Sequence, residues 1–171
     1  MSLAEYYTLL QNRELLFSYQ FKVTINSEWL NFGSDNVTLF ATGTQLPNYA
    51  IDTLNVPYKG VLAKIPGTVV PADNWTVTIQ ATNDMKLYES FLNWAKSISN
   101  PNDKPHGRDW GFYSKDKAEV EVLKADDLKT ATYRYKLDGI FPANIGAPTL
   151  DMASQELVKF TVQFQYNKFN P

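Results

Sequence analysis

Apolar and polar residues alternate in the stretch Phe17-Ser18-Tyr19-Gln20-Phe21-Lys22-Val23-Thr24-Ile25. Successive side chains of a β-strand point to opposite faces, so this stretch has one apolar face and one polar face. The same alternation runs through Tyr133-Arg134-Tyr135-Lys136-Leu137 and through residues 158–166. The polar faces carry mostly Thr, Gln, Ser and Lys and no cluster of reactive groups. The pattern predicts half-buried strands whose polar faces form a wall.

Further strands and a helix are predicted on either side of these stretches. The predicted strands cover residues 37–42, 75–82, 118–124, 130–140 and 156–167. Between residues 84 and 99 the period changes, and apolar residues fall at helical spacing: Met85, Tyr88, Phe91, Leu92, Ala95 and Ile98. This spacing predicts a helix with Asn83 or Asp84 as its N-cap.

The segment 45–72 is predicted to be irregular, because four prolines and two glycines interrupt its β-branched residues. Its content of Val, Leu, Ile and Tyr is too apolar for a solvated linker. We therefore expect it to be an arm that docks on another surface. Residues 142–154 and 100–112 are predicted to be loops.

These elements predict a single domain over residues 1–171 that is mainly β, with six or seven strands. The expected fold is two packed antiparallel sheets, a β-sandwich or barrel-like arrangement, with one α-helix. We expect a flexible N-terminal segment at 1–15 and a long docking loop at about 53–71.

Composition excludes several classes of function. The chain has 171 residues, 44% hydrophobic, with 16 basic and 18 acidic groups and a net charge of -2. This balance lacks the concentration of Lys and Arg that duplex DNA binders use. There is no cysteine, which removes disulfides and thiolate chemistry. The N-terminus has no basic segment followed by an apolar block, so we expect no signal peptide. No apolar run is long enough to span a membrane. We therefore expect no membrane association and synthesis in a cytoplasm.

The sequence offers weak candidates for catalysis. His106, the sole histidine, lies in a polar loop without a nucleophile elbow. The carboxylate pairs Glu119 with Glu121 and Asp126 with Asp127 lie on a solvated strand face and at a turn. Tyr133 and Tyr135 point away from Arg134 and Lys136, so no base-stacking platform forms. We expect no enzymatic activity, no catalytic residue, no cofactor and no metal.

An ordered series of short motifs carries a resemblance to a known family. The series runs from Leu46-Pro47 through Asn74-Trp75-Thr76-Val77-Thr78-Ile79 and a helix with Phe91-Leu92-x-Trp94. It continues with Leu137-x-Gly139-Ile140-Phe141-Pro142-x-x-Ile145-Gly146 and ends in the strand from Glu156 to Tyr166. Over residues 17–167 this series resembles the tail tube protein family of contractile-tailed bacteriophages.

The resemblance implies a structural subunit of the virion tail tube. Subunits of this family form hexameric rings that stack into a tube, and DNA passes through its lumen during ejection. The implied partners are copies of the same chain and the tail sheath, baseplate or tube initiator, tape measure and tail terminator proteins. DNA would pass without specific binding. The implied location is the virion, with assembly in the host cytoplasm.

Position in the family assigns roles to two groups of residues. The segment 53–71 corresponds to a loop that reaches neighbouring subunits or rings, and the helix at 84–99 would lie outside the lumen. The expected contact residues are Val56, Pro57, Tyr58, Lys59, Val61, Leu62, Ile65 and Pro66. The candidate lumen-facing acids are Glu119, Glu121, Asp126 and Asp127, although nearby lysines leave the sheet face that lines the lumen open.

Two alternatives remain. The chain could be a tube initiator at the baseplate, or the tube of a tailocin, a contractile injection device or a type VI secretion system. It could also be a soluble β-barrel module that binds a small ligand, which would require a partly unfilled apolar interior. The high Phe and Tyr content predicts a filled core instead.

Overall fold

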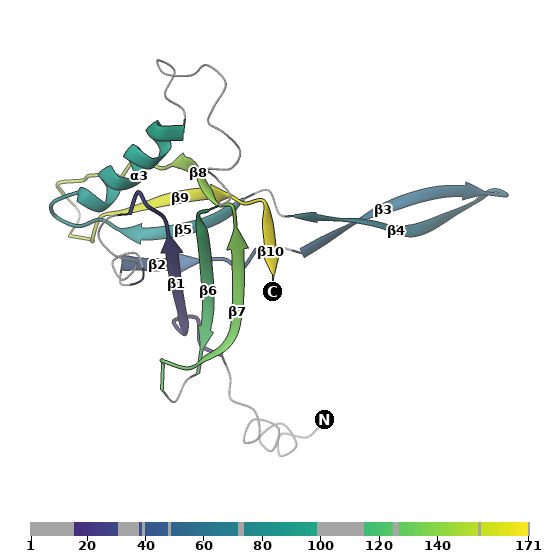
Figure 1. Cartoon of the computed structure of the whole chain (residues 1–171), viewed down its shortest axis with the longest axis horizontal. Helices are drawn as coiled ribbons and strands as arrows, with labels where there is room; N and C mark the ends of the chain where they lie inside the picture. The colour runs from purple at the N-terminus through teal and green to yellow at the C-terminus, as the bar shows by residue number, and fades with distance from the viewer. Residues whose placement is uncertain are drawn as a thin grey trace.

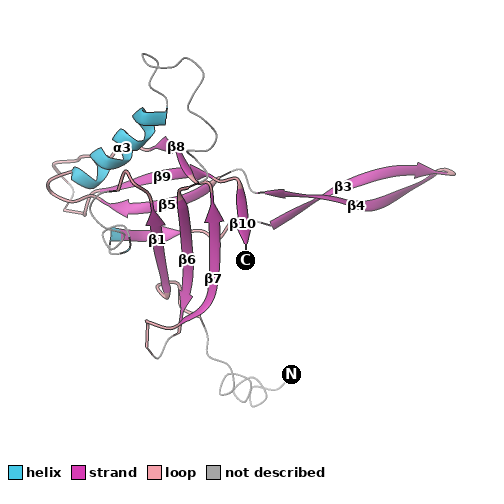
Figure 2. Ribbon diagram, in the orientation of Figure 1, coloured by secondary structure: helices cyan, strands magenta, loops and turns pink. Residues whose placement is uncertain are grey.

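The computed structural model describes residues 16–30, 38, 40–47, 49–71, 74–98, 115–124, 127–153 and 155–170. Figure 1 shows two sheets whose strands cross, a helix beside them and a long hairpin that projects from one end. Strands dominate the described chain (Figure 2). The predicted fold class, packed antiparallel sheets with a helix, is confirmed. Among the described residues, the sheets stay open and do not close into a barrel.

Sheet A holds four strands in the order β1-β6-β7-β10, all antiparallel. These strands are β1 (Phe21–Asn26), β6 (Lys117–Leu123), β7 (Ala131–Asp138) and β10 (Lys168–Asn170). The register places Val120 between Val23 and Tyr135, and all three side chains are buried. The alternation of β1 and β7 therefore places one face of the sheet in the core, as predicted, except that Tyr133 near the start of β7 is 44% exposed.

Sheet B holds four strands in the order β2-β5-β9-β8, also antiparallel. These strands are β2 (Ala41–Thr44), β5 (Trp75–Gln80), β9 (Lys159–Gln165) and β8 (Phe141–Ile145). Their buried cross-strand pairs are Trp75 with Phe164, Val77 with Val162, and Ile79 with Phe160. The predicted inner faces of both strands are confirmed.

Helix α3 (Lys86–Ile98) packs on this apolar face of sheet B. Its buried side chains are Leu87, Phe91 and Trp94, at the i, i+4, i+7 spacing of one helical face. The Phe91 ring lies 6.0 Å from that of Phe160 and 6.1 Å from that of Phe164. The prediction placed Phe91 correctly, and Tyr88 and Ile98 also pack against the core. It did not include Leu87 and Trp94, which are buried, in place of the half-buried Met85 and Ala95.

The helix begins beside Asp84, one of the two predicted N-caps. The Lys86 amide donates to Asp84 Oδ1 over 3.3 Å, and the Thr82 hydroxyl donates to the same oxygen over 2.6 Å. The hydrogen bond from Thr82 is the main cause that lowers the pKa of the Asp84 carboxyl, and the contacts with Lys86 add to it. A carboxylate at this end also suits the helix dipole.

The first predicted strand starts too early. β1 begins at Phe21, and Phe17 and Tyr19 are exposed and stack on one another in the turn before it. The Gln20 amide donates to the Phe17 carbonyl, and the Phe21 amide donates to that of Tyr19. These local bonds hold a turn, so the alternation of residues 17–20 reflects no strand.

Three other predicted boundaries differ from the structure. The strand predicted at 37–42 begins only at Ala41, because Thr38 and Phe40 are helical. As β2 it continues through Gly43, which pairs with Thr78 after a register shift at Thr42. β7 ends at Asp138, and a turn at Gly139, with φ of 67°, leads into β8 within the predicted loop. The predictions for residues 1–15, for 100–112 with His106, and for Asp126 fall outside the described residues.

Candidate functional site: the projecting hairpin and the outer sheet faces

The segment predicted to be irregular is a regular hairpin of β3 (Tyr49–Tyr58) and β4 (Val61–Pro71). Its two-residue turn is Lys59-Gly60, with φ of 47° and 81°. Positive φ at both turn positions gives the twist that two antiparallel strands need, and glycine adopts it without a steric cost. The prediction failed because it counted the prolines and glycines only as interruptions.

Two prolines fit into this hairpin because of where the register places them. Pro57 lies opposite Leu62, and Pro66 lies opposite Thr53. Hydrogen-bonded and non-bonded pairs alternate along an antiparallel ladder, and these two pairs are an even number of steps apart. Both prolines therefore belong to the same class of pair, the one in which a missing N–H costs nothing.

The register also sorts the hairpin side chains into two faces. Leu54 pairs with Ile65, Val56 with Ala63, and Tyr58 with Val61. Cross-strand partners share a face, so these six residues form one apolar surface, which we call the hairpin face. It consists of Leu54, Val56, Tyr58, Val61, Ala63 and Ile65. The opposite face carries Thr53, Asn55, Pro57, Leu62, Lys64 and Pro66.

The hairpin face is open to solvent. Tyr58 is 65% exposed and Val61 70%, and the other large members of the face are exposed too. β3 and β4 pair only with each other among the described strands, and they project away from both sheets (Figure 1). Exposed apolar patches of this kind are typical of interaction surfaces.

The predicted contact residues therefore divide between the two faces. Val56, Tyr58, Val61 and Ile65 lie on the hairpin face, whereas Pro57, Leu62 and Pro66 lie on the other. Lys59 lies in the turn, with its ammonium group 5.5 Å from the Tyr58 ring centre. The prediction missed Leu54 and Ala63. Counting alternate residues outward from a Lys59-Gly60 turn would have found both.

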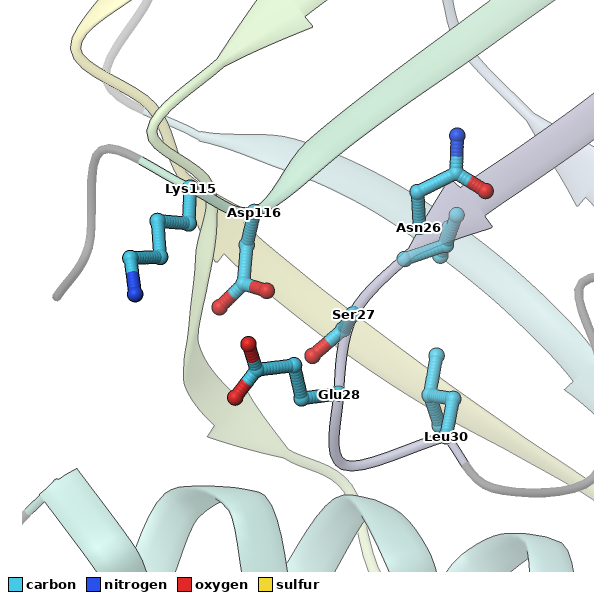
Figure 3. Close-up of a pocket in the computed structure, with 7 residues that line it drawn as sticks. Asn26, Ser27, Glu28, Leu30, Lys115 and Asp116 are labelled. Carbon is cyan, nitrogen blue, oxygen red and sulfur yellow. The ribbon is translucent and has the colours of Figure 1, made fainter.

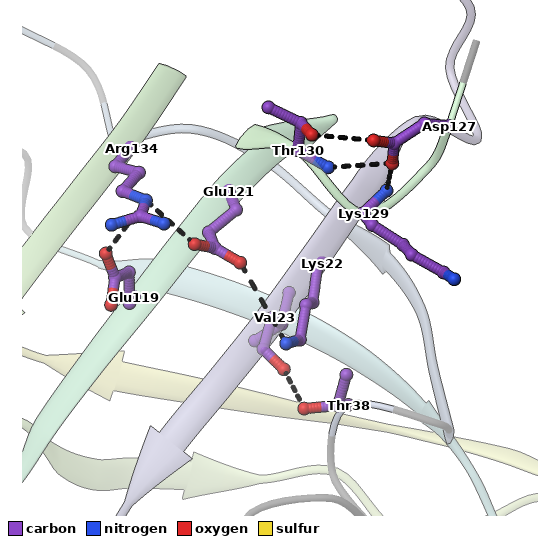
Figure 4. A network of polar contacts seen from close by, with 9 residues as sticks. All are labelled: Lys22, Val23, Thr38, Glu119, Glu121, Asp127, Lys129, Thr130 and Arg134. Atoms are coloured by element: carbon purple, nitrogen blue, oxygen red, sulfur yellow. Dashed lines mark hydrogen bonds and ion pairs between the residues drawn. The ribbon is translucent and has the colours of Figure 1, made fainter. Parts of the chain in front are cut away.

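The outer face of sheet A carries two of the four candidate lumen acids. Glu119 and Glu121 point to the same side of β6, with Arg134 and Lys22 on the neighbouring strands (Figure 4). Arg134 Nε lies 2.9 Å from Glu121 Oε1 and 3.9 Å from Glu119 Oε1, and Lys22 Nζ lies 4.0 Å from Glu121 Oε2. Glu121 is thus paired with a base on each side, whereas Glu119 shares Arg134 at the longer distance.

Asp127 lies apart from this group, in the turn before β7. Its carboxylate accepts hydrogen bonds from the Lys129 amide, the Thr130 amide and the Thr130 hydroxyl (Figure 4). The Thr130 hydroxyl contributes most to lowering the pKa of Asp127. This is a turn-capping role.

The outer face of sheet B is polar and nearly uncharged. Thr76 lies opposite Gln163, and Thr78 lies opposite Thr161. The hydroxyls of Thr42 and Thr44 on β2 donate to the Thr78 and Thr76 carbonyls. The Gln165 amide group donates to Asn74 Oδ1 over 2.8 Å. The predicted wall of Thr and Gln is therefore present on this face.

A pocket of about 420 Å³ lies beside the end of β1 (Figure 3). It is lined by the buried Asp116 and by Ser27, Glu28 and Lys115. Burial raises the pKa of Asp116, while its hydrogen bond with Ser27 opposes that shift. The Asp116 carbonyl accepts hydrogen bonds from the Gly139 and Ile140 amides, so this residue joins the start of β6 to the turn after β7. Within the described residues, no group of three potential metal ligands occurs.

Each sheet presents two edge strands, β1 and β10 in sheet A and β2 and β8 in sheet B. The free side of an edge strand offers backbone N–H and C=O groups to another chain. Among the described helices, none is long and apolar enough to cross a membrane.

Comparison with known proteins identifies relatives of this chain. A family model described as phage tail tube protein matches residues 11–171. The tail tube protein gp19 of Enterobacteria phage T4 is 22% identical over 130 residues, which cover 76% of this chain and 78% of the phage protein.

Solved structures share the fold. The cap that terminates the tube of the anti-feeding prophage superposes with a TM-score of 0.67 at 16% identity, covering 92% of this chain and 91% of that one. The sheath-tube complex of the extracellular contractile injection system PVC contains a chain that superposes with a TM-score of 0.66 at 14% identity. The match covers 99% of this chain and 97% of that one. The match of the family model spans nearly the whole sequence, and this chain therefore belongs to the phage tail tube protein family.

Proposed function

We propose that this protein forms hexameric rings that stack into the tail tube of a contractile-tailed phage, and that DNA passes through the lumen into the host. The observation that carries the proposal is the hairpin face, an apolar surface held away from the domain by two strands that pair only with each other among the described strands. Membership of the tail tube family supports assembly into a tube rather than action as a free monomer.

The sheet edges supply the second means of association. β1 or β10 of one subunit can continue the ladder of a neighbour, as can β2 or β8. Joining edges within a ring leaves the hairpin to reach an adjacent subunit or ring. Both contacts would join copies of the same chain.

The lumen must let DNA slide without holding it. We assign this role to the outer face of sheet A, which carries Glu119 and Glu121. Their ion pairs with Arg134 and Lys22 offset part of the positive charge of this face, which would limit the number of counterions that bound phosphate releases. We infer a structural function without catalysis, cofactor or metal. Asp127 caps its own turn and does not share the ion-pair network of Glu119 and Glu121.

As the tube of a contractile tail, the protein would have further partners. The sheath would surround the tube, the baseplate initiator and the terminator would hold its ends, and the tape measure would occupy the lumen during assembly. The tube would belong to the virion and be built in the host cytoplasm.

A second candidate is the tube or cap of a contractile injection device. The fold superposes on the anti-feeding prophage cap and on a PVC chain over at least 91% of either partner. A small-ligand module lacks such support, because Trp75, Phe91, Trp94 and Phe164 fill the space between α3 and sheet B.

Electron microscopy of the concentrated, purified chain tests the proposal. We expect hollow tubes with six-fold end views. The matched variant replaces residues 55–64 by Asn-Gly, so that the pair Leu54–Ile65 closes the shortened hairpin in the way that Tyr58–Val61 closes the native one. It should keep the circular dichroism spectrum of the parent and remain unassembled. Normal tubes from this variant would reject the role of the hairpin, and monomers of the parent at every concentration would reject the tube.

A further inference from the structure

An exposed hollow lies at the end of the domain opposite the hairpin. Its volume is about 560 Å³, and the residues that line it include Leu150, Asp151, Met152, Glu156, Leu157 and Val158. The three largest apolar side chains, Leu150, Met152 and Leu157, are 77%, 106% and 67% exposed. Large apolar side chains therefore gather without cover in this hollow as well as on the hairpin face.

The sheet register fixes the hollow at the far end. β4 leads into β5 at Trp75, and β5 then runs away from the hairpin to Gln80. Gln80 pairs with Lys159, the first residue of β9, so the segment that leads into β9 lies at that distant end (Figure 1). The projecting apolar surface and the apolar hollow therefore occupy opposite ends of the long axis.

The two surfaces complement each other in shape and charge. The hairpin is a narrow, convex two-stranded ribbon, and the hollow is concave. Lys59 in the turn is basic, whereas the residues that line the hollow include the acidic Asp151 and Glu156 beside the basic Lys159. Complementary charges of this kind fix the register of a contact that apolar burial stabilises.

We propose that the hairpin face of one subunit docks in the hollow of a second copy, where Val61 and Tyr58 meet Leu150, Met152 and Leu157. The contact is heterologous, since a different surface of each copy takes part, and such contacts repeat into rings or continuous stacks. This inference rests on the proposed tube, and it names the surface of the neighbour that receives the hairpin. The exposed pair Phe17 and Tyr19, whose rings stack on one another in the turn before β1, is the competing receptor.

Cross-linking between single-cysteine variants tests the contact, because the native chain has no cysteine. Val61→Cys protein is mixed with differently tagged Met152→Cys protein, allowed to assemble and treated with a short bismaleimide. We expect at least several-fold more mixed covalent dimer than with Glu89→Cys, which places the thiol on the exposed side of α3. A parallel experiment uses Tyr19→Cys in place of Met152→Cys and tests the competing receptor.

The outcomes separate the inference from the function on which it rests. Tubes that cross-link Val61→Cys to Tyr19→Cys, or to neither partner, would overturn the docking site and leave the tube standing. Absence of tubes would overturn both. As a second measurement, Leu157→Asp should reduce the tube fraction as strongly as Val61→Asp, while Leu157→Met keeps it. Unimpaired assembly by Leu157→Asp would also overturn the docking site.

Discussion

Trp75 and Phe164 face each other across β5 and β9, with their ring centres 5.2 Å apart and their planes tilted by 33°. Trp94 of α3 lies 5.9 Å from the same Phe164 ring, so the pair links sheet B to the helix. Trp75 Nε1 also donates to Thr44 Oγ1 over 3.0 Å, which ties the pair to the edge strand β2. These contacts make the pair a centre of the core.

Phe164→Ala should lower the free energy of unfolding by about 3–5 kcal/mol, because it removes a fully buried ring and leaves a cavity between β9 and α3. Urea denaturation of the unassembled protein measures the loss. Gln163→Ala, on the opposite face of β9, should change stability by less than about 0.5 kcal/mol. A loss below about 1 kcal/mol for Phe164→Ala would mean that the face of β9 is assigned wrongly.

Gly139→Ala should destabilise the domain by about 1–3 kcal/mol, since its φ of 67° strains any other residue. An added Cβ would also lie 2.5 Å from Asn167 Nδ2 and 3.2 Å from Asn167 Cβ. Gly60→Ala is the control, because its φ of 81° carries the same strain but nothing lies within 4 Å. Thermal unfolding should show a larger loss for Gly139→Ala, because β3 and β4 lie outside both sheets. Equal losses would contradict the role of the turn in joining β7 to β8.

Asp116→Asn should make stability less dependent on pH. Burial raises the pKa of Asp116 above 3.8, so the folded state binds this proton more tightly than the unfolded state. The resulting stabilisation is complete below the unfolded pKa and is lost as the pH rises through the folded pKa. The variant should therefore gain stability over the parent on going from pH 4 to pH 7, as denaturant titrations at several pH values would show.

Asp127→Asn is the control, because its effect on the pH dependence of stability should have the opposite sign. Its folded pKa is lowered, chiefly by the Thr130 hydroxyl, so its stabilisation is present above pH 3.8 and is lost as the pH falls through the folded pKa. The variant should lose stability relative to the parent at neutral pH and approach it in acid. If the stability difference from the parent changed with pH in the same direction for both variants, the assigned burial of Asp116 would be contradicted.

Glu119→Gln combined with Glu121→Gln should make tubes retain DNA, if the outer face of sheet A lines the lumen. The change leaves Arg134 and Lys22 without their acids, and an excess of positive charge binds phosphate through counterion release. DNA that sediments with tubes should rise several-fold and fall again with added salt. Asp84→Asn with Glu89→Gln removes the same charge beside and on α3 and should leave retention unchanged. Equal retention by both variants would assign the lumen to another face.

Alternation of residue type was sufficient to predict most of the core. Trp75, Val77 and Ile79 and their partners Phe160, Val162 and Phe164 lie on the predicted face, because a half-buried strand must separate apolar from polar side chains every second residue. The carboxylates Glu119 and Glu121 were also placed on one face correctly. The helix and the burial of Phe91 were predicted correctly, but the predicted apolar face left out Leu87 and Trp94, which are buried.

The hairpin shows why part of the candidate site could not be predicted. The prolines at 57 and 66 fit a strand only because both fall in non-bonded pairs, and that depends on the register set by the Lys59-Gly60 turn. The neutralisation of Glu121 by Arg134 likewise depends on how β6 aligns with β7.

The sequence by itself determined that this protein is mainly β, that β5 and β9 bury their large apolar residues, and that the segment around residue 60 carries uncovered apolar side chains. These properties are local, since each follows from the spacing of residues within one strand. Only the tertiary structure decided that this segment is a projecting hairpin with one apolar face, and that the hollow beside Leu150 and Leu157 lies at the opposite end. Such relations depend on register and strand order, which join residues far apart in the chain through long-range pairing and packing that no local pattern encodes.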